Sequence, residues 1–403
     1  MKFSEYYLNQ LGNIARGRSR HRPRDAAFLY GGPYPFIQTG DIRRANLYLS
    51  DFDQTYSEAG LEQSRLWPAG TLCITIAANI AETAILGIDA CFPDSVIGFT
   101  ADPEKSDVKF VKYLFDADLK YKYRSFTQGA AQDNLSQEKL LSIKFSVPDV
   151  VVQRRISTIL SSYDDLIENN QRRIALLEES ARLLYREWFV HFRFPGHEHV
   201  KIIDGLPQGW EKKRLVDCVT FQSGGTPRKS KSEYWSGDVP WISSGELTTM
   251  RVSTSQYRVT DEAVRDGSRY AEKDTILAVV RGMSLAKEFR IGIVSRRVCF
   301  NQDVKAFVPD RGIPGLFVFH ALSDQKEQIR QRAGQASHGT KKLETSILED
   351  VSIIVPSSML LEHFTDLVRS MHDQWDCLFS QNQKLAQARD LLLPRLMSGE
   401  ISV

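Results

Sequence analysis

The sequence predicts an α+β protein with an internal pseudo-two-fold repeat, in which each copy is a mixed block of strands and short helices followed by a long helix. Three observations support this class. Short segments recur in the same order at a nearly constant spacing of about half the 403-residue chain. Turn-rich segments with β-branched runs precede two long heptad patterns. The composition, with 42% hydrophobic and 25% charged residues, is that of an ordinary globular protein.

The repeat is carried by four pairs of segments. Chance similarity of strand-like runs is the alternative, and the common order and spacing argue against it. The pairs are residues 35–42 and 240–247, 70–72 and 274–276, 91–92 and 299–300, and 143–148 and 351–356.

Each block is predicted to be a mixed globular domain. The first spans residues 1–148 and the second residues 209–356, and the Pro- and Gly-containing residues 196–208 link the two copies. Residues 71–76 and 275–280 are apolar and partly β-branched, which predicts strands. Each block ends at a Val-Pro step, which suits the start of a helix. Gly- and Pro-containing clusters predict loops at residues 31–33, 224–227 and 312–314.

The helix regions, residues 149–195 and 357–403, carry stripes that alternate at spacings of three and four residues. Such long patterns indicate a coiled coil. Helices of about forty residues span about 55 Å, more than either block needs for its own core, so we expect the two helices to pack on each other and hold the blocks apart. Asn170 and Asn382 lie in the stripes. They either fix the register of the helix pair or are tolerated polar contacts. Arg389 interrupts the second stripe, which predicts a wider contact face there.

Charge and cysteine content limit the classes of function. The net charge is only +2, and the second block is the basic one, with 23 basic against 18 acidic residues. Nucleic acid would therefore have to be bound by local basic patches. The polar N-terminus, the absence of a long apolar stretch and five widely spaced cysteines predict a cytoplasmic protein without a membrane span or a disulfide framework. His197 and His199 lie in the linker without matching ligands, so no metal site is expected.

Four longer sequence motifs are specific for one protein family when they occur together, although each alone would be a weak signal. The sequence has LYREWFVHFRFPG at residues 184–196, LPQGWEKKRL at 206–215, GGTPRKSKSEYWSGDVPWISSGEL at 224–247 and LLLPRLMSGEI at 391–401. In order and spacing over the whole chain they resemble the specificity subunit of type I restriction–modification systems. The first block matches less well, because it lacks the Gly-Gly-Thr-Pro loop and has Gly31-Gly32-Pro33-Tyr34 before its Pro-Phe-Ile segment.

The resemblance implies that the blocks are target recognition domains and that the two helices form an antiparallel spacer. Each domain would recognise one half of a bipartite, asymmetric site in double-stranded DNA, with the helices setting the gap. The chain would do no chemistry and bind no cofactor. Two methyltransferase subunits would use S-adenosylmethionine to methylate adenine, and motor-nuclease subunits would join them.

Basic clusters are the candidate DNA contacts, because arginine pairs bidentately with phosphates and guanine edges and an asparagine can do so with adenine. The alternatives are a solvated basic loop, an ordinary turn or a buried structural asparagine. Glycines at 224 and 225 would let the backbone approach the duplex. The candidates are Arg16, Arg18, Arg20, Arg22, Arg24 and Asn79 in the first block, and Thr226, Arg228, Lys229, Lys231, Tyr234, Arg281, Lys287 and Arg290 in the second.

Other functions remain as alternatives. Asp94, Asp107 and Lys109 loosely match the carboxylate-and-lysine pattern of metal-dependent nucleases, where carboxylates hold Mg²⁺ and the lysine orients a water. A scaffold that only joins proteins through its coiled coil is a second alternative. A related phage-defence methyltransferase that uses the same subunit without cleavage is a third. The sequence contains neither an Asp-Pro-Pro-Tyr box nor a phosphate-binding Gly-Lys-Ser/Thr loop.

Overall fold

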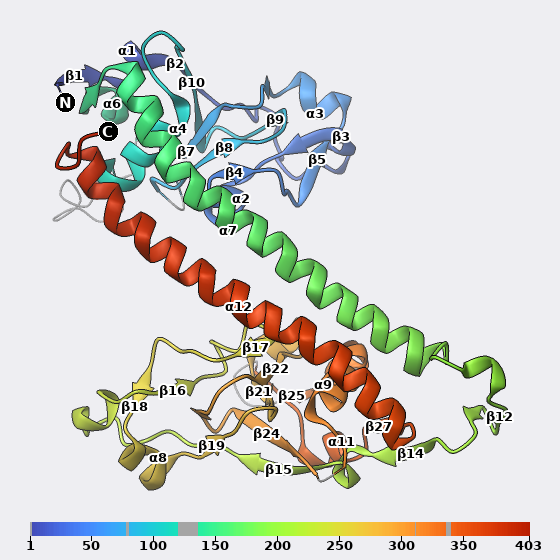
Figure 1. Cartoon of the computed structure of the whole chain (residues 1–403). Helices are drawn as coiled ribbons and strands as arrows, with labels where there is room; N and C mark the ends of the chain where they lie inside the picture. The colour runs from blue at the N-terminus through green and yellow to red at the C-terminus, as the bar shows by residue number, and fades with distance from the viewer. Residues whose placement is uncertain (1, 78–79, 120–135, 311, 336–339) are drawn as a thin grey trace. The chain divides into compact units, whose positions relative to one another are not determined.

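The computed structural model describes residues 2–77, 80–119, 136–310, 312–335 and 340–403 (Figure 1). It divides into two compact units. The first unit comprises Met1–Gln171 with Ser380–Val403, and the second comprises Arg172–Phe379. Each unit therefore contains one block together with a part of both long helices. The domain limits expected at residues 148 and 209 stay a prediction.

The first unit is built on three sheets. Its strands are β1 (Phe3–Tyr7), β2 (Gly12–Arg16), β3 (Tyr30–Phe36), β4 (Tyr48–Leu49), β5 (Gln54–Tyr56), β6 (Leu66–Trp67), β7 (Leu72–Thr75), β8 (Thr83–Leu86), β9 (Ala90–Cys91), β10 (Val96–Ala101) and β11 (Lys144–Pro148). The sheet orders are β2-β10-β7-β8-β4, β5-β3-β9-β6 and β1-β11. Neighbouring strands are antiparallel except for the pairs β4·β8 and β3·β9.

The second block repeats these sheets and adds a small one. Its strands are β14 (Glu211–Arg214), β15 (Val219–Ser223), β16 (Val239–Ile242), β17 (Arg251–Val252), β18 (Arg258–Val259), β19 (Tyr270–Ala271), β20 (Ile276–Val279), β21 (Arg281–Gly282), β22 (Ile291–Val294), β23 (Val298–Phe300), β24 (Val304–Pro309), β25 (Gly334–Gln335), β26 (Lys341–Lys342) and β27 (Ser352–Val355). The orders are β15-β24-β20-β22-β17, β18-β16-β23-β19, β14-β27 and β21-β26-β25.

The two blocks correspond strand for strand in their three shared sheets. The parallel pairs also correspond, because β17·β22 and β16·β23 take the places of β4·β8 and β3·β9. This topology confirms the predicted internal repeat. The strands expected at residues 71–76 and 275–280 are β7 and β20. The loop expected at residues 31–33 is wrong, since these residues lie inside β3.

Short helices complete both blocks, and a hairpin lies in the linker. The hairpin strands are β12 (Ile202–Ile203) and β13 (Leu206–Pro207). The α-helices are α1 (Leu8–Leu11), α2 (Thr39–Arg44), α3 (Glu58–Glu62), α4 (Val108–Leu114), α6 (Gln137–Ser142), α8 (Asp261–Gly267), α9 (Gly315–Asp324), α10 (Lys326–Gln331) and α11 (Thr345–Glu349). The 3₁₀ and π turns are η1 (Ala27–Leu29), η2 (Phe115–Leu119), η3 (Arg186–Val190), η4 (His197–His199), η5 (Leu215–Asp217), η6 (Ser232–Trp235) and η7 (Met283–Ala286).

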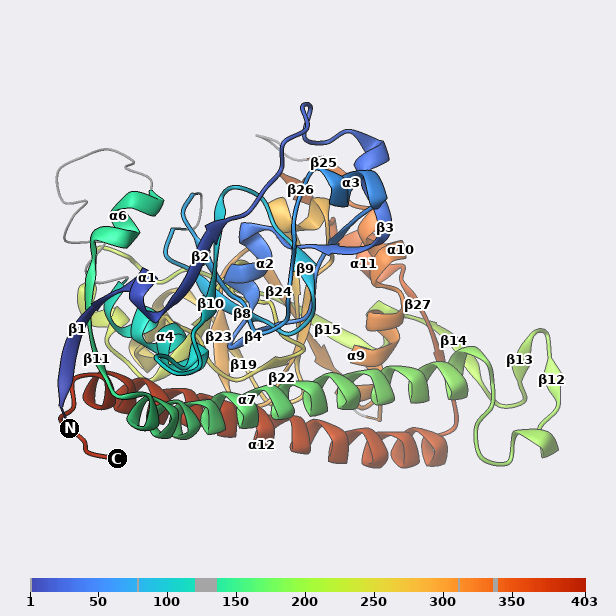
Figure 2. The ribbon, with the colours of Figure 1, turned by 90° about the horizontal axis from the view of Figure 1, so that it is seen from above.

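Two long helices, α7 (Val150–Tyr185) and α12 (Ser358–Met397), pack on each other as the stripes predict (Figures 1 and 2). They are antiparallel, because Asn170 of α7 contacts Asn382 of α12, whereas Glu178, later in α7, contacts Trp375, which is earlier in α12. The Val-Pro step does not begin α7: Pro148 ends β11, and Asp149 caps the helix by accepting the backbone N–H of Val151 at 3.0 Å. Among the helices of the described residues, none has the length and apolar character of a membrane span.

The sequence motifs at residues 184–196 and 391–401, near the ends of the long helices, pack into the cores of the two units. In the second unit, Trp188, Phe189 and Phe194 are buried, and the ring of Phe189 lies 4.9 Å from that of Phe364. Near the C-terminus, Leu396 and Met397 join the core of the first unit together with Phe145 and other residues of its block. Each motif therefore anchors a helix end to the core of one unit.

Candidate nucleic-acid interface

The loop that follows β2 presents the predicted arginine cluster. Arg16, Arg18, Arg20, Arg22 and Arg24 are all exposed. Some of them already have protein partners. Arg22 Nη1 donates to two backbone carbonyls at 2.7 Å, Arg24 Nη2 donates to the Asp94 carboxylate at 3.0 Å, and Arg16 donates to the Asp94 carbonyl. Within the described residues, the Arg18 and Arg20 guanidiniums have no ion-pair partner, so they are the most available cations of the loop.

The backbone of this loop is held firmly although its side chains are exposed. Gly17 lies against Phe92 so closely that a Cβ would stand 2.5 Å from the Phe92 carbonyl oxygen. The Arg18 N–H donates to the same oxygen at 3.1 Å, and the Arg20 N–H donates to Gln63 Oε1 at 2.6 Å. The loop therefore projects its arginines from a fixed main chain.

The loop after β15 is anchored in the same way in the second unit. A Cβ on Gly224 would stand 2.3 Å from the Phe300 carbonyl oxygen, which accepts the Gly225 N–H at 2.9 Å. Gly17 and Phe92 are thus the counterparts of Gly224 and Phe300. The close approach that requires these glycines here is to the protein's own backbone, and a close approach to DNA stays a prediction.

The residues of the second loop that are predicted to contact DNA differ in their exposure and in their partners within the protein. Arg228 and Lys229 are exposed, and Arg228 Nε lies 3.4 Å from Asp266. Thr226 donates to Gln302 Oε1 at 2.7 Å. Lys231 Nζ donates to the Tyr234 hydroxyl at 2.9 Å, and this hydrogen bond raises the pKa of Lys231 and keeps it cationic.

Tyr234 differs from the other candidates of this loop. It is only 3% exposed and packs with Trp241 and Val259 in a small core, so its ring supports the loop.

A third basic cluster lies on the small sheet β21-β26-β25. Arg281 and Lys287 are exposed, and Arg290 Nε lies 3.3 Å from Glu288. The sheet brings in residues that the sequence analysis missed, because the backbone of Arg281 pairs with that of Lys342 on β26. About sixty residues separate these partners, and the Lys-Lys dipeptide was the only local signal. Asn79 lies outside the described residues.

The residues that would form a nuclease site make structural contacts within the protein. Asp107 caps α4 by accepting the Phe110 N–H at 2.9 Å, and Asp94 pairs with Arg24. Lys109 Nζ lies 3.4 Å from Ser161 Oγ. Within the described part of the chain, no group of three or more acidic, His or Cys side chains could hold a metal ion.

The two asparagines of the helix stripes meet. Asn170 Nδ2 donates to Asn382 Oδ1 at 2.9 Å, and Asn382 Nδ2 donates to the Ile167 carbonyl at 3.3 Å. Asn170 is 6% exposed. We expect this partly buried amide pair to be satisfied in one alignment of the helices, so a register role stays our prediction.

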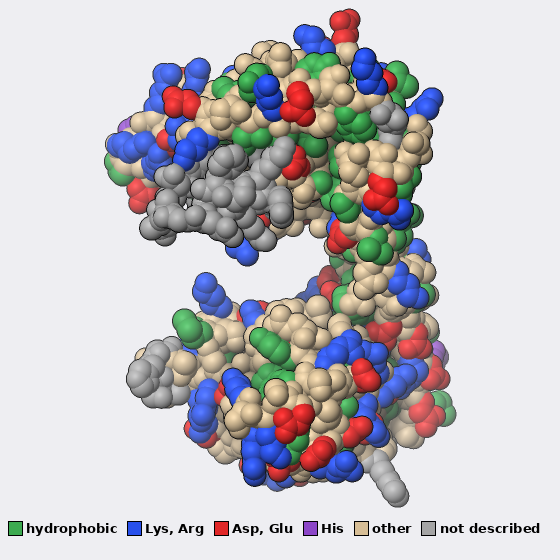
Figure 3. Space-filling view, turned by 90° about the vertical axis from the view of Figure 1, so that its left-hand side faces the viewer, with side chains coloured by type: hydrophobic (Ala, Val, Ile, Leu, Met, Phe, Trp, Pro, Cys, Tyr) green, Lys and Arg blue, Asp and Glu red, His purple; other side chains and the backbone are tan. Residues whose placement is uncertain are grey.

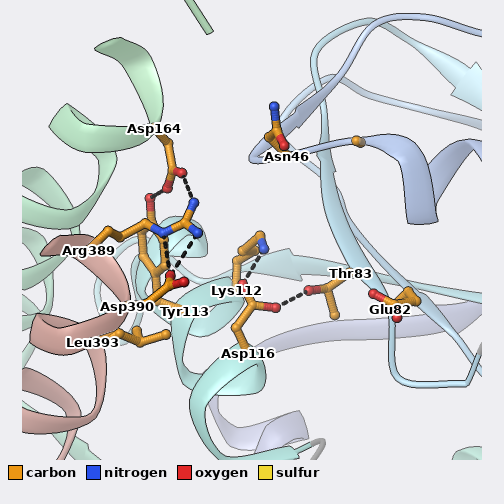
Figure 4. Close-up of a pocket in the computed structure, with 11 residues that line it drawn as sticks. Asn46, Glu82, Thr83, Lys112, Tyr113, Asp116, Asp164, Arg389, Asp390 and Leu393 are labelled. Atoms are coloured by element: carbon orange, nitrogen blue, oxygen red, sulfur yellow. Dashed lines mark hydrogen bonds and ion pairs between the residues drawn. The ribbon is translucent and has the colours of Figure 1, made fainter. Parts of the chain in front are cut away.

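Arg389, which interrupts the second stripe, joins a buried network in the first unit (Figure 4). It pairs with Asp164 of α7, whose side chain is 4% exposed, and Asp164 also accepts from the Tyr113 hydroxyl of α4. Burial and Asp164 raise the pKa of Tyr113, so it stays a neutral donor. The network lines a polar cavity of about 390 Å³ and fixes the first block to both helices.

A different polar cluster occupies the equivalent place in the second unit. His320 of α9 and His372 of α12 meet with their Nε2 atoms 3.1 Å apart. Arg251 Nη1 lies 3.4 Å from His372 Nδ1, and its Nε donates to Asp376 at 3.1 Å. A guanidinium only donates, so His372 accepts at Nδ1 and donates from Nε2 to His320.

Comparisons with known proteins agree over the length of the chain. A family model described as type I restriction modification DNA specificity domain matches residues 2–179 and 207–359. The type I restriction enzyme MjaIX specificity subunit of Methanocaldococcus jannaschii is 27% identical, covering 98% of this chain and 93% of that protein. The HindI specificity subunit of Haemophilus influenzae is also 27% identical, covering 99% and 100%. The crystal structure of a type I restriction–modification S subunit from M. genitalium has a TM-score of 0.63 at 16% identity, covering 98% and 96%, which shows the shared fold.

Proposed function

The chain belongs to the family of type I restriction–modification DNA specificity subunits, and we propose that each of its two blocks recognises one half of a bipartite, asymmetric DNA site. It is the subunit that gives a type I restriction enzyme complex its DNA specificity and is not itself catalytic. The first half-site would be bound by residues 1–148 and the second by residues 209–356.

One observation supports this assignment most directly: two exposed basic loops occupy equivalent positions in the repeat. Both leave the edge strand of a five-stranded sheet, β2 or β15, and both hydrogen-bond to a Phe carbonyl. The side chains differ, with Arg18 and Arg20 in one loop and Arg228 and Lys229 in the other. An equivalent frame with different contacts is what recognition of two different half-sites requires.

Local cations matter here because the overall field is weak. On the face shown in Figure 3, Lys and Arg side chains are interspersed with Asp and Glu, as the formal charge of +2 suggests. The basic loops would therefore provide the phosphate and base contacts individually.

The long helices would set the gap between half-sites and bind two methyltransferase subunits. Exposed apolar residues along α7 support a partner surface, since a helix in contact with water alone would be polar there. Those subunits would hold S-adenosylmethionine and methylate adenine, and motor-nuclease subunits would join the complex. The exposed apolar residues of α7 are Val151, Ile159, Leu166, Leu176 and Leu183.

Exchange of one block tests the proposal. Residues 1–148 would be replaced by the corresponding block of a relative that keeps a tyrosine at position 113, so that the Asp164 network is preserved. Genome-wide mapping of methylated adenines should show one half of the site changed and the other half and the gap unchanged.

The reciprocal exchange of residues 209–356 is the matched control, and it should change the opposite half. If either exchange alters both halves, or if both exchanges alter the same half, the assignment of one block to each half-site is wrong.

A further inference from the structure

The second unit holds an exposed methionine between two of the proposed DNA contacts. Met283 begins η7, directly after β21, and it lies between Arg281 and Lys287 in the sequence. It is 77% exposed, which is more than any other large apolar side chain of the described residues outside α12.

The turn that presents Met283 is well anchored. Leu285, two residues on, is fully buried in the core of the unit. Arg330 Nη1 of α10 donates to the Ala286 carbonyl at 3.0 Å, and the Lys287 N–H donates to the Ser284 carbonyl at 2.9 Å. Gly282, which precedes the turn, has a φ of 146° that side chains rarely adopt. Met283 is therefore held out by the fold.

The surroundings of Met283 are mainly cationic. Arg281 and Gly282 pair with Lys342 and Lys341 on the adjacent strand β26, which Figure 2 shows next to β25. The nearby acidic groups are engaged, because Glu344 lies 2.8 Å from Lys342 and Glu288 lies 3.3 Å from Arg290. A single apolar side chain among cations suits duplex DNA, which has charged phosphates outside and stacked bases inside. It suits an apolar protein surface less well.

We propose that Met283 acts as a wedge that inserts between two stacked base pairs of the half-site bound by the second block. The inference rests on the proposed function. Apolar side chains, methionine among them, are used in this way by proteins that kink DNA, and an unbranched thioether adapts to a narrow gap. Phosphate contacts from Arg281 and Lys287 would offset the cost of unstacking. An unstacked step would also make it easier for a partner methyltransferase to extrude an adenine.

The chain offers a matched control. Ile202 is 57% exposed and lies on β12 of the linker hairpin, outside the long helices and the basic loops, so Ile202→Ala removes a large apolar side chain from an exposed position elsewhere. Met283→Leu keeps an apolar wedge, whereas Met283→Ala removes it. All variants would be purified as complexes with the methyltransferase subunits. Their binding would be measured on a duplex that carries the methylated site mapped for the wild type.

The first measurement scans 2-aminopurine through the second half-site. The wild type, Ile202→Ala and Met283→Leu should give a fluorescence rise at one step, which reports unstacking, and Met283→Ala should abolish it. We expect Met283→Ala to weaken binding about tenfold, or about 1.4 kcal/mol. Retention of the rise by Met283→Ala would overturn the proposal.

A second measurement separates the wedge from an ordinary contact. Replacing the responsive base by an abasic position removes the stacking in advance, so Met283→Ala should bind this duplex as tightly as the wild type does. If the tenfold loss persists on the abasic duplex, Met283 is not a wedge. A wild-type complex that does not prefer the mapped site over a scrambled duplex would instead contradict the proposed function itself.

Discussion

Asn170 of α7 and Asn382 of α12 are joined by a hydrogen bond of 2.9 Å between their side-chain amides. Each lies in a stripe of largely apolar residues, and the bond is available in only one alignment of the two helices. Farther along, Trp375 Nε1 donates to Glu178 Oε1 at 2.8 Å. These two contacts mark the alignment of α7 with α12 that the structure shows.

Removing one asparagine should cost more stability than removing both. Asn170→Leu leaves Asn382 Oδ1 without its donor in a half-buried position, although Asn382 Nδ2 keeps the Ile167 carbonyl. We therefore expect the free energy of unfolding to fall by about 1–3 kcal/mol. Asn170→Leu combined with Asn382→Leu should recover most of that loss, since two apolar side chains can pack in the stripe. Urea denaturation measures both, and Asn169→Leu, at the exposed neighbouring position, is the control. A double variant less stable than both single ones would contradict this.

Disrupting the Asp164 network should lower the free energy of unfolding more than disrupting the asparagine pair does. Asp164→Ala leaves the partly buried Arg389 without its main carboxylate and Tyr113 without its acceptor. We expect a loss of about 3 kcal/mol in the free energy of unfolding, measured by urea denaturation. Asp390→Ala removes the other, exposed carboxylate of Arg389 and should cost less than about 1 kcal/mol. Equal losses in the two variants would show that burial of Asp164 does not matter.

The histidine pair predicts a specific loss of stability in mild acid. Burial lowers the pKa of His320 to about 3, and burial, His320 and Arg251 lower the pKa of His372 to about 2. Below about pH 6.5 the unfolded chain takes up these protons and the folded chain does not, so stability falls as the pH falls. Around pH 4 to 5, between the unfolded and folded pKa values, the pair should contribute a slope of up to about 2.7 kcal/mol per pH unit.

The double variant His320→Leu with His372→Leu isolates this contribution. Arg251 keeps Asp376 as its partner in the variant. Urea denaturation between about pH 6 and pH 4 should give a clearly shallower fall in the free energy of unfolding than in the wild type. Parallel curves for the two proteins would show that the pair does not stay neutral in the fold.

The arginine loop should account for a measurable part of the salt dependence of DNA binding. If Arg18 and Arg20 each neutralise one phosphate, changing both to alanine should lower the slope of log K against log salt by about 1.8. Arg182→Ala with Arg395→Ala removes the same charge from residues that are already ion-paired, and should leave the slope nearly unchanged. An unchanged slope with an altered base preference would mean that the two arginines contact bases.

Sequence patterns revealed the features that are local or periodic. The stripes placed both long helices and put Asn170 and Asn382 on the contact faces, because heptad spacing alone decides which residues face the partner helix. Only the structure shows that the two amides bond to each other. The equivalence of Gly17 and Gly224 was missed, since the more similar Pro-Phe-Ile segment drew the comparison to residues 31–36. The His320–His372 pair gave no signal, because its members lie on separate helices and neither belongs to a local motif.

The last prediction tests the proposed role of the helices in setting the gap between the half-sites. Four residues inserted into α7 between Asn170 and Glu178, with four more into α12 between Trp375 and Asn382, would keep both interhelical contacts in place. The helix pair lengthens by about 6 Å at 1.5 Å per residue, and four residues slightly exceed one turn, so the stripes keep facing each other. B-DNA rises about 3.4 Å per base pair, so the gap should grow by one or two base pairs.

An added base pair also turns the far half-site by about 35°, so binding should weaken as the junctions between blocks and helices adjust. Genome-wide mapping of methylated adenines would show the longer gap with both half-site sequences unchanged. Insertion into α7 alone is the control, because it displaces one of the two contacts and should reduce stability without defining a new gap. A doubly inserted subunit that folds, supports methylation and keeps the original gap would show that the helices do not set the spacing.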